Sequence, residues 1–97
     1  MEEIIYYNSL YDLYGELLTE KQRKYFEDYY FNNFSYSEIA ENYHVSRNAA
    51  FKQLHNVLEK LEDYEKKLKL LEKRELLKKI VSKISDIRIK NELENLF

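Results

Sequence analysis

The sequence predicts an all-α protein built around a helix-turn-helix, and three observations support this fold class. The chain of 97 residues has no proline and one glycine, so residues that break helices are almost absent. Apolar residues recur at helical spacing along most of the chain. The stretch SYSEIAENYHVSRNAAFKQLH has the length and polar caps of two helices joined by a tight turn. With 44% hydrophobic residues there is material for one core, which predicts a single domain over residues 1–97.

The first third of the chain predicts two helices. Apolar spacing favours a helix over residues 2–14, and we expect it to stop at Gly15, because glycine tolerates positive φ at a helix end. Thr19 and Gln22 have the spacing of a capping box and predict the start of a second helix. Aromatic residues at helical spacing extend this helix to about Asn32.

The first helix of the motif and its turn have distinct signals. Either Ser35 or Ser37 can cap this short helix. Ala40 is the small residue that lets a second helix pack closely, and Val45 is expected to fill the turn. His44 occupies the place where many such turns have glycine, so we expect it in the left-handed conformation.

The second helix of the motif is predicted to be long and to begin at a cap on Ser46. Its apolar stripe comprises Ala50, Leu54, Val57, Leu58, Leu61, Tyr64, Leu68 and Leu71. The next apolar seam starts out of phase with this stripe, so at residues 73–75 the helix either breaks or changes its packing partner, and we favour a break or bend. A last helix is expected after a cap on Ser85.

One sector of this second helix lies off the apolar stripe and is the candidate nucleic-acid-binding surface. Its residues are Ser46, Arg47, Asn48, Phe51, Lys52 and His55. Arg47 and Lys52 can contact phosphate or guanine, Asn48 can pair with adenine, and His55 can donate to a backbone oxygen. Phe51 can meet a thymine methyl group, stack on an unpaired RNA base or anchor a protein partner, unless another helix of the chain covers it.

Three pieces of sequence, LTEKQR, SEIAENYHVSR and LEDYEKKL, carry a family resemblance. The segment that contains them, residues 18–68, resembles region 4 of bacterial sigma factors. Together with the helical tail over residues 69–97, the chain is similar to the YlxM family of small helix-turn-helix proteins. This resemblance implies a sigma region 4 type of core followed by extended basic C-terminal helices. It also implies association with the signal recognition particle, with the particle RNA or DNA and a particle protein as partners.

Charge is distributed unevenly along the chain. The formal net charge of −2 combines a net −6 over residues 1–46 with a net +7 over residues 66–90. The chain can therefore present a basic surface despite its overall negative charge. The basic tail, which contains KKLKLLEKRELLKKIVSK, can grip RNA phosphates or can be a solvated helix face.

Other classes of function find little support. There is no cysteine, and His44 and His55 lack the companions of a metal site, so we expect no metal, no cofactor and no enzymatic activity. No apolar run approaches the roughly 20 residues that span a membrane, and the acidic N-terminus predicts a cytoplasmic protein. Two apolar seams that face opposite ways predict a homodimer. A transcriptional regulator, a particle adaptor and a protein-binding scaffold remain the three readings.

Overall fold

The computed structural model describes residues 2–96, and within this range the chain forms helices and no strand. The elements in chain order are α1 (Glu2–Tyr14), the short 3-10 helix η1 (Gly15–Leu17), α2 (Glu20–Tyr30), α3 (Tyr36–Tyr43), α4 (Arg47–Leu68), α5 (Leu70–Val81) and α6 (Ile87–Glu94). The predicted all-α class is confirmed.

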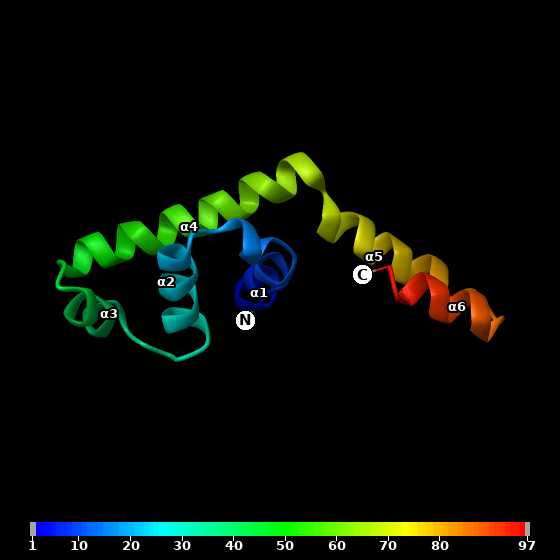
Figure 1. Ribbon diagram of the computed structural model, residues 1–97, viewed down its shortest axis with the longest axis horizontal. Helices are drawn as coiled ribbons and strands as arrows, with labels where there is room; N and C mark the ends of the chain where they lie inside the picture. The colour runs from blue at the N-terminus through cyan, green and yellow to red at the C-terminus, as the bar shows by residue number, and fades with distance from the viewer. Residues whose placement is uncertain (1, 97) are drawn as a thin grey trace.

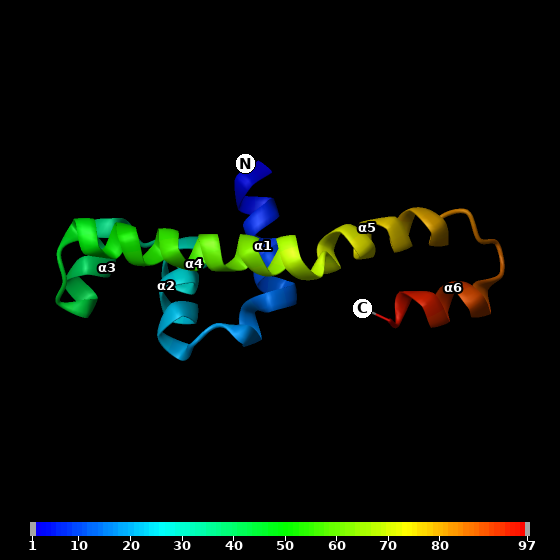
Figure 2. The same cartoon turned by 90° about the horizontal axis from the view of Figure 1, so that it is seen from above.

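The long helix α4 is the spine of the molecule. Figure 1 shows α1, α2 and α3 along one side of α4, with α5 and α6 extending beyond its C-terminal end. Seen from above, α1 crosses α4 steeply, and α5 and α6 run side by side as a hairpin (Figure 2). The molecule measures 55 × 25 × 22 Å along its principal axes. The helix-turn-helix therefore lies at one end of an elongated protein and the basic tail at the other.

The capping boxes of α2 and α3 form from local sequence signals. The Thr19 hydroxyl accepts from the Gln22 backbone N–H at 3.1 Å, and the Gln22 side chain accepts from the Thr19 N–H at 2.9 Å. Of the two serines that can cap α3, Ser35 does so and Ser37 does not. Glu38 completes the second box, with both hydrogen bonds to Ser35 at 3.1 Å. These caps satisfy N–H groups that a helix start leaves without partners.

Gly15 has a different role from the one the sequence suggested. It does not adopt positive φ, and it begins η1 directly after α1, so its predicted role as a left-handed helix stop is wrong. A Cβ at this position would lie 3.2 Å from the Tyr11 ring. That ring stacks on Phe26 with centroids 4.2 Å apart and planes 7° apart. Glycine is favoured here because it lets the Tyr11 ring pack close to the backbone.

The buried side chains form two clusters that share α4. The larger joins α1, α2 and α4 and consists of Leu10, Tyr14, Leu18, Phe26, Leu54, Val57, Leu58 and Leu61. The smaller joins α2, α3 and α4 and consists of Tyr25, Ile39, Ala40 and Ala50. The predicted stripe on α4 is confirmed from Ala50 to Leu61, whereas Leu68 is exposed. Each large apolar side chain buried in this way contributes about 1.5–3 kcal/mol to folding.

The helix breaks at Lys69, four residues before the predicted position at residues 73–75. Lys69 has φ 55° and ψ 32°, which is left-handed, and α5 starts at the next residue. The Glu65 carboxylate, one turn back on α4, accepts from the N–H groups of Leu71 at 2.9 Å and Glu72 at 3.2 Å. The Tyr14 hydroxyl accepts from the Leu70 N–H at 3.0 Å. A side chain from α1 and one from α4 therefore cap α5 and fix where it begins.

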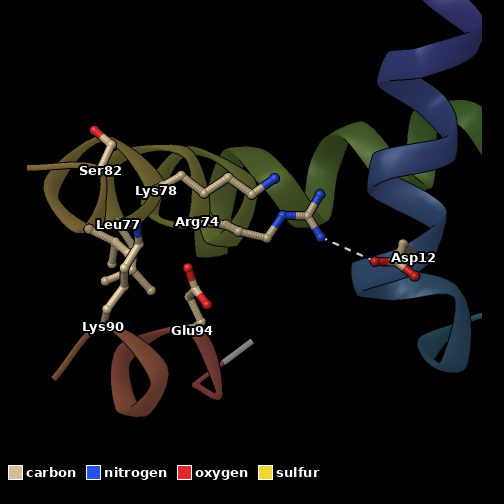
Figure 3. A pocket seen from close by; sticks show the side chains of 8 residues that line it. Asp12, Arg74, Leu77, Lys78, Ser82, Lys90 and Glu94 are labelled. Carbon is tan, nitrogen blue, oxygen red and sulfur yellow. Dashed lines mark hydrogen bonds and ion pairs between the residues drawn. The ribbon is translucent and has the colours of Figure 1, made fainter. Parts of the chain in front are cut away.

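The hairpin of α5 and α6 has few buried residues. Asp86, and not the predicted Ser85, caps α6 by accepting from the N–H groups of Arg88 and Ile89. Arg74 reaches back to α1 and pairs with Asp12 at 3.1 Å (Figure 3). A cavity of about 480 Å³ lies beside this pair, lined by residues of α1, α5 and α6. The tail is thus held to the body mainly at its start, and its outer apolar side chains remain exposed: Leu76, Ile80, Ile87, Ile89 and Leu96.

Candidate nucleic-acid interface

The turn between α3 and α4 is a left-handed cap. His44 has φ 55° and ψ 42°, as predicted. The Val45 N–H donates to the Ala40 carbonyl at 3.0 Å, and the His44 N–H donates to the Glu41 carbonyl at 3.4 Å. This pair of hydrogen bonds is the Schellman arrangement, which satisfies the last carbonyls of α3. Val45 itself is 38% exposed, so the prediction that it fills the turn is wrong.

Small and aromatic side chains fix the angle between α3 and α4. Ala40 and Ala50 are both buried in the smaller cluster, as close packing of two helices requires. Tyr25 from α2 stacks on Tyr43 from α3, with centroids 4.6 Å apart. The Tyr43 hydroxyl donates to Asp28 at 2.9 Å. Burial, together with this hydrogen bond, raises the pKa of Tyr43 to about 12, so the hydroxyl stays protonated and keeps donating at neutral pH.

The start of α4 is fixed by Ser46. Its hydroxyl oxygen accepts from the Ala49 N–H at 3.0 Å, which confirms the predicted cap. Replacing such a cap by alanine typically costs about 1 kcal/mol. Ser46 therefore orients the first turn of α4, and any contact it makes with a ligand would use the hydroxyl hydrogen that the cap leaves free.

The five other predicted site residues are exposed on the N-terminal half of α4: Arg47, Asn48, Phe51, Lys52 and His55. Across residues 2–96, neither Arg47 nor Lys52 forms an ion pair with a carboxylate. Both cations can therefore meet a phosphate without first breaking an internal salt bridge. The helical spacing correctly predicted that these five side chains are exposed on α4.

Phe51 lies in the middle of this sector and contacts a residue that the sequence did not single out. Its ring meets the Tyr36 ring edge to face, with centroids 5.2 Å apart, and it remains 39% exposed. The Arg47 guanidinium lies 5.7 Å from the Tyr36 ring centroid, within cation–π range. Tyr36 is the first residue of α3, and only the folded pair of helices brings it against α4. Burial raises the pKa of Tyr36 to about 12, so it is neutral at physiological pH.

His55 has a defined orientation. Its ring stacks on Phe51 at 3.9 Å between centroids, and its Nδ1 lies 3.0 Å from the Phe51 carbonyl oxygen. A carbonyl can only accept, so Nδ1 carries the hydrogen, and the Nε2 of the neutral ring is an acceptor. The predicted donation from His55 to a nucleic-acid backbone oxygen would then have to come from Nε2, which carries a hydrogen only in the protonated imidazolium.

The basic tail is separated from this surface. Figure 1 shows α5 and α6 at the opposite end of α4 from α3 and the start of α4. The two basic segments are thus joined by a single long helix and do not form one continuous patch. A nucleic acid that touched both would have to run along much of the 55 Å length of the protein.

Within residues 2–96, no group of three or more histidine, cysteine or acidic side chains is arranged to hold a metal ion. No helix in the same range is long and apolar enough to cross a membrane.

Comparison with known proteins gives a consistent match along the chain. Residues 1–96 match the family described as "Putative helix-turn-helix protein, YlxM / p13 like". The chain is 43% identical over 86 residues to a UPF0122 protein of Geobacillus kaustophilus, which covers 89% of this chain and 78% of that protein. It is 40% identical over 87 residues to UPF0122 protein YlxM of Bacillus subtilis, with 90% and 79% covered. A UPF0122 protein of Bacillus licheniformis is 45% identical over 80 residues, with 82% and 75% covered.

Proposed function

The chain belongs to the YlxM / p13-like family of helix-turn-helix proteins, and from this premise we propose that it binds nucleic acid through the exposed sector at the start of α4, without catalysis. The second helix of a helix-turn-helix ordinarily presents its N-terminal residues to nucleic acid, while the first helix crosses the backbone. In this protein the angle between α3 and α4 is set by the smaller buried cluster, in which Ala40 of α3 packs with Ala50 of α4.

The observation that supports the proposal most strongly is that two cationic side chains of the sector are exposed and form no ion pair within residues 2–96. Arg47 and Lys52 project from the exposed sector, and no carboxylate within residues 2–96 pairs with either of them. Asn48, also exposed, offers both a donor and an acceptor to a base edge. The overall charge of −2 weakens long-range attraction, so we expect modest affinity that depends on salt.

The resemblance to the YlxM family supports a regulatory role with the signal recognition particle. The ligand would then be the particle RNA or a DNA element, with a particle protein as a second partner. Crosslinking in cell extract, followed by recovery of particle RNA, particle protein or duplex DNA, distinguishes these ligands. Recovery of a protein alone would favour the scaffold reading over the nucleic-acid reading.

Replacing Arg47 and Lys52 together by alanine is expected to weaken binding about tenfold or more at low salt, because each cation is expected to neutralise a phosphate. Fluorescence anisotropy with a labelled DNA duplex and a labelled RNA hairpin measures the effect. Between about 50 and 200 mM salt, the slope of log affinity against log salt should also fall by about 2.

The matched control removes the same charge elsewhere. Lys21 and Lys24 are exposed on α2, so Lys21→Ala with Lys24→Ala loses two positive charges outside the sector. This control should keep the parent affinity within about twofold, because dissolved ions screen the attraction between the nucleic acid and charges far from the binding surface. The proposal fails if the Arg47 and Lys52 double variant remains folded and binds both probes as the parent does.

We further propose that the tail mediates homodimerisation, because its outer apolar face is left exposed by the described part of the chain, residues 2–96. Ile80 is 57% exposed on α5 and Ile87 is 71% exposed on α6. We propose a second copy of the chain as the partner because of its charge distribution. The basic segment of one copy, residues 66–90, is complementary in charge to the acidic segment of the other, residues 1–46. A twofold arrangement would place the tail of each copy on the acidic half of the other.

Light scattering at micromolar concentration should report twice the chain mass of 12.0 kDa. Leu76→Gln with Ile80→Gln should shift the protein toward monomer, because it removes apolar contact area from the proposed interface. Glu72→Gln with Glu75→Gln, on the same helix, is the control and should leave the dimer intact. A parent protein that is monomeric under these conditions contradicts the proposed dimer.

A further inference from the structure

Three aromatic rings form a small platform in the middle of the candidate interface. Tyr36, Phe51 and His55 contact one another in series, with centroid distances of 5.2 Å and 3.9 Å. Phe51 is 39% exposed although the residues around it on α4 are polar. A large apolar ring in the centre of a polar, cationic face indicates a ligand with an apolar surface of its own.

The platform is held rigidly from the core outwards. Tyr36 stacks on Tyr29, with centroids 5.0 Å apart and planes 19° apart. Tyr29 meets Tyr30 edge to face, and Tyr30 stacks on the fully buried Phe26 at 4.6 Å. A ladder of aromatic contacts therefore connects the exposed rings to the main core. Because these rings are already ordered, a ligand that stacks on them loses less conformational entropy in binding.

The hydrogen bond of His55 fixes the outer end of the platform. Nδ1 donates to the Phe51 carbonyl at 3.0 Å, so the imidazole cannot rotate freely away from the Phe51 ring. The planes of the Phe51 and His55 rings are 30° apart, and this hydrogen bond holds them in that arrangement. Because the His55 ring covers one face of Phe51, the part of the Phe51 ring that remains exposed is held in a fixed orientation.

Two cationic side chains of α4 lie next to the platform. Arg47 lies over the Tyr36 ring at 5.7 Å, and Lys52 follows Phe51 directly on α4 and is exposed. Aromatic rings next to basic side chains are the combination that proteins use for single-stranded nucleic acid, in which cations meet phosphates and rings meet bases. In a duplex the base faces are covered by neighbouring bases, and only base edges reach a groove.

We propose that Phe51, backed by Tyr36 and His55, stacks on an unpaired nucleobase while Arg47 and Lys52 contact the flanking phosphates. This inference rests on the proposed nucleic-acid function and specifies its ligand as an unpaired nucleotide in a loop or single strand. The shared chemistry is the exposed face of a base, which an RNA loop and single-stranded DNA both provide.

The test compares paired and unpaired forms of one sequence. The probes are a labelled RNA hairpin with a single-stranded loop, the same RNA with its loop closed by a complementary strand, and single-stranded DNA of the loop sequence. Phe51→Ala should weaken binding to both unpaired probes about 5- to 150-fold, the range expected for the loss of one stacked base. Binding to the closed probe should change less than about twofold.

Phe51→Leu separates stacking from general apolar contact. Leucine keeps an apolar side chain of similar bulk and has no aromatic face, so it should lose nearly as much affinity as alanine. The Lys21→Ala and Lys24→Ala control, outside the sector, should bind the unpaired probes within about twofold of the parent. Circular dichroism confirms that each variant is folded, which we expect because Phe51 lies off the buried stripe of α4.

The failures of the two proposals are distinguishable. If Phe51→Ala binds the unpaired probes as the parent does, or loses the closed probe equally, stacking is wrong. If the Arg47 and Lys52 double variant has nevertheless lost binding, the nucleic-acid function stands without stacking. If the parent binds none of the three probes, both proposals fail and Phe51 is left to a protein partner. If the parent binds only one of the two unpaired probes and Phe51→Ala weakens that binding, the stacking stands and that probe identifies the source of the base.

Discussion

Tyr14→Ala is expected to lower the free energy of unfolding by about 3–5 kcal/mol, the range for deleting a large buried aromatic ring. Tyr14 is fully buried between α1 and α4, and its ring lies 5.9 Å from that of Tyr64. The hydroxyl donates to Glu65 at 2.6 Å and accepts from the Leu70 N–H at 3.0 Å. Burial is the main cause that raises the pKa of Tyr14, so this hydroxyl remains a donor at neutral pH. Alanine would leave a cavity and also remove part of the cap of α5.

Urea unfolding followed by circular dichroism measures this loss. Tyr14→Phe keeps the ring and removes the two hydrogen bonds, so it should cost about 1–3 kcal/mol. Ile5→Ala, at a side chain that is 67% exposed, should stay within about 0.5 kcal/mol of the parent. A loss below about 1 kcal/mol for Tyr14→Ala would contradict the position of Tyr14 at the junction of α1, α4 and α5.

Ala40→Leu should destabilise the protein by about 1–3 kcal/mol and should also reduce nucleic-acid binding. Ala40 is 6% exposed and shares a buried cluster with Ala50 across the contact between α3 and α4. A leucine side chain has no room there, so the two helices must move apart. Because Arg47 and Phe51 are positioned by this contact, the interface should be disturbed together with the core.

Thermal unfolding checks this prediction, since each kcal/mol corresponds to a fall in Tm of about 4–8 °C in a domain of this size. Glu41→Leu introduces the same side chain at the neighbouring exposed position and should leave Tm nearly unchanged. Equal Tm values for Ala40→Leu and the parent would show that α3 and α4 do not pack as closely as described.

Most features determined by nearby residues could be predicted from the sequence, although the cap of α6 is Asp86 and not the predicted Ser85. The caps at Thr19 and Ser46 depend on hydrogen bonds to backbone groups three residues away, and both were correctly placed. His44 was correctly expected in the left-handed conformation. The exposed sector followed from helical spacing, which fixes the direction of a side chain whenever the helix and one buried face are known.

Features determined by distant residues could not be predicted in the same way. The phase shift between apolar seams indicated a break after α4, but its position at Lys69 depends on the contact of Tyr14 with Glu65 and Leu70. The role of Gly15 depends on the ring of Tyr11, and the platform depends on Tyr36 meeting Phe51 across two helices. Spacing along one helix carries no information about the ring that lies against it.

The most direct test of the nucleic-acid interface is NMR titration of the ¹⁵N-labelled protein with the looped RNA hairpin. Our account predicts that the amide signals that change most cluster at Tyr36 and over residues 46–55, with the side-chain signals of Asn48 and His55 among them. The signals of α5 and α6 should change less, because they lie at the other end of the molecule. Changes confined to residues 70–96, or no changes at concentrations where the RNA binds, would contradict the assignment of this interface to the start of α4.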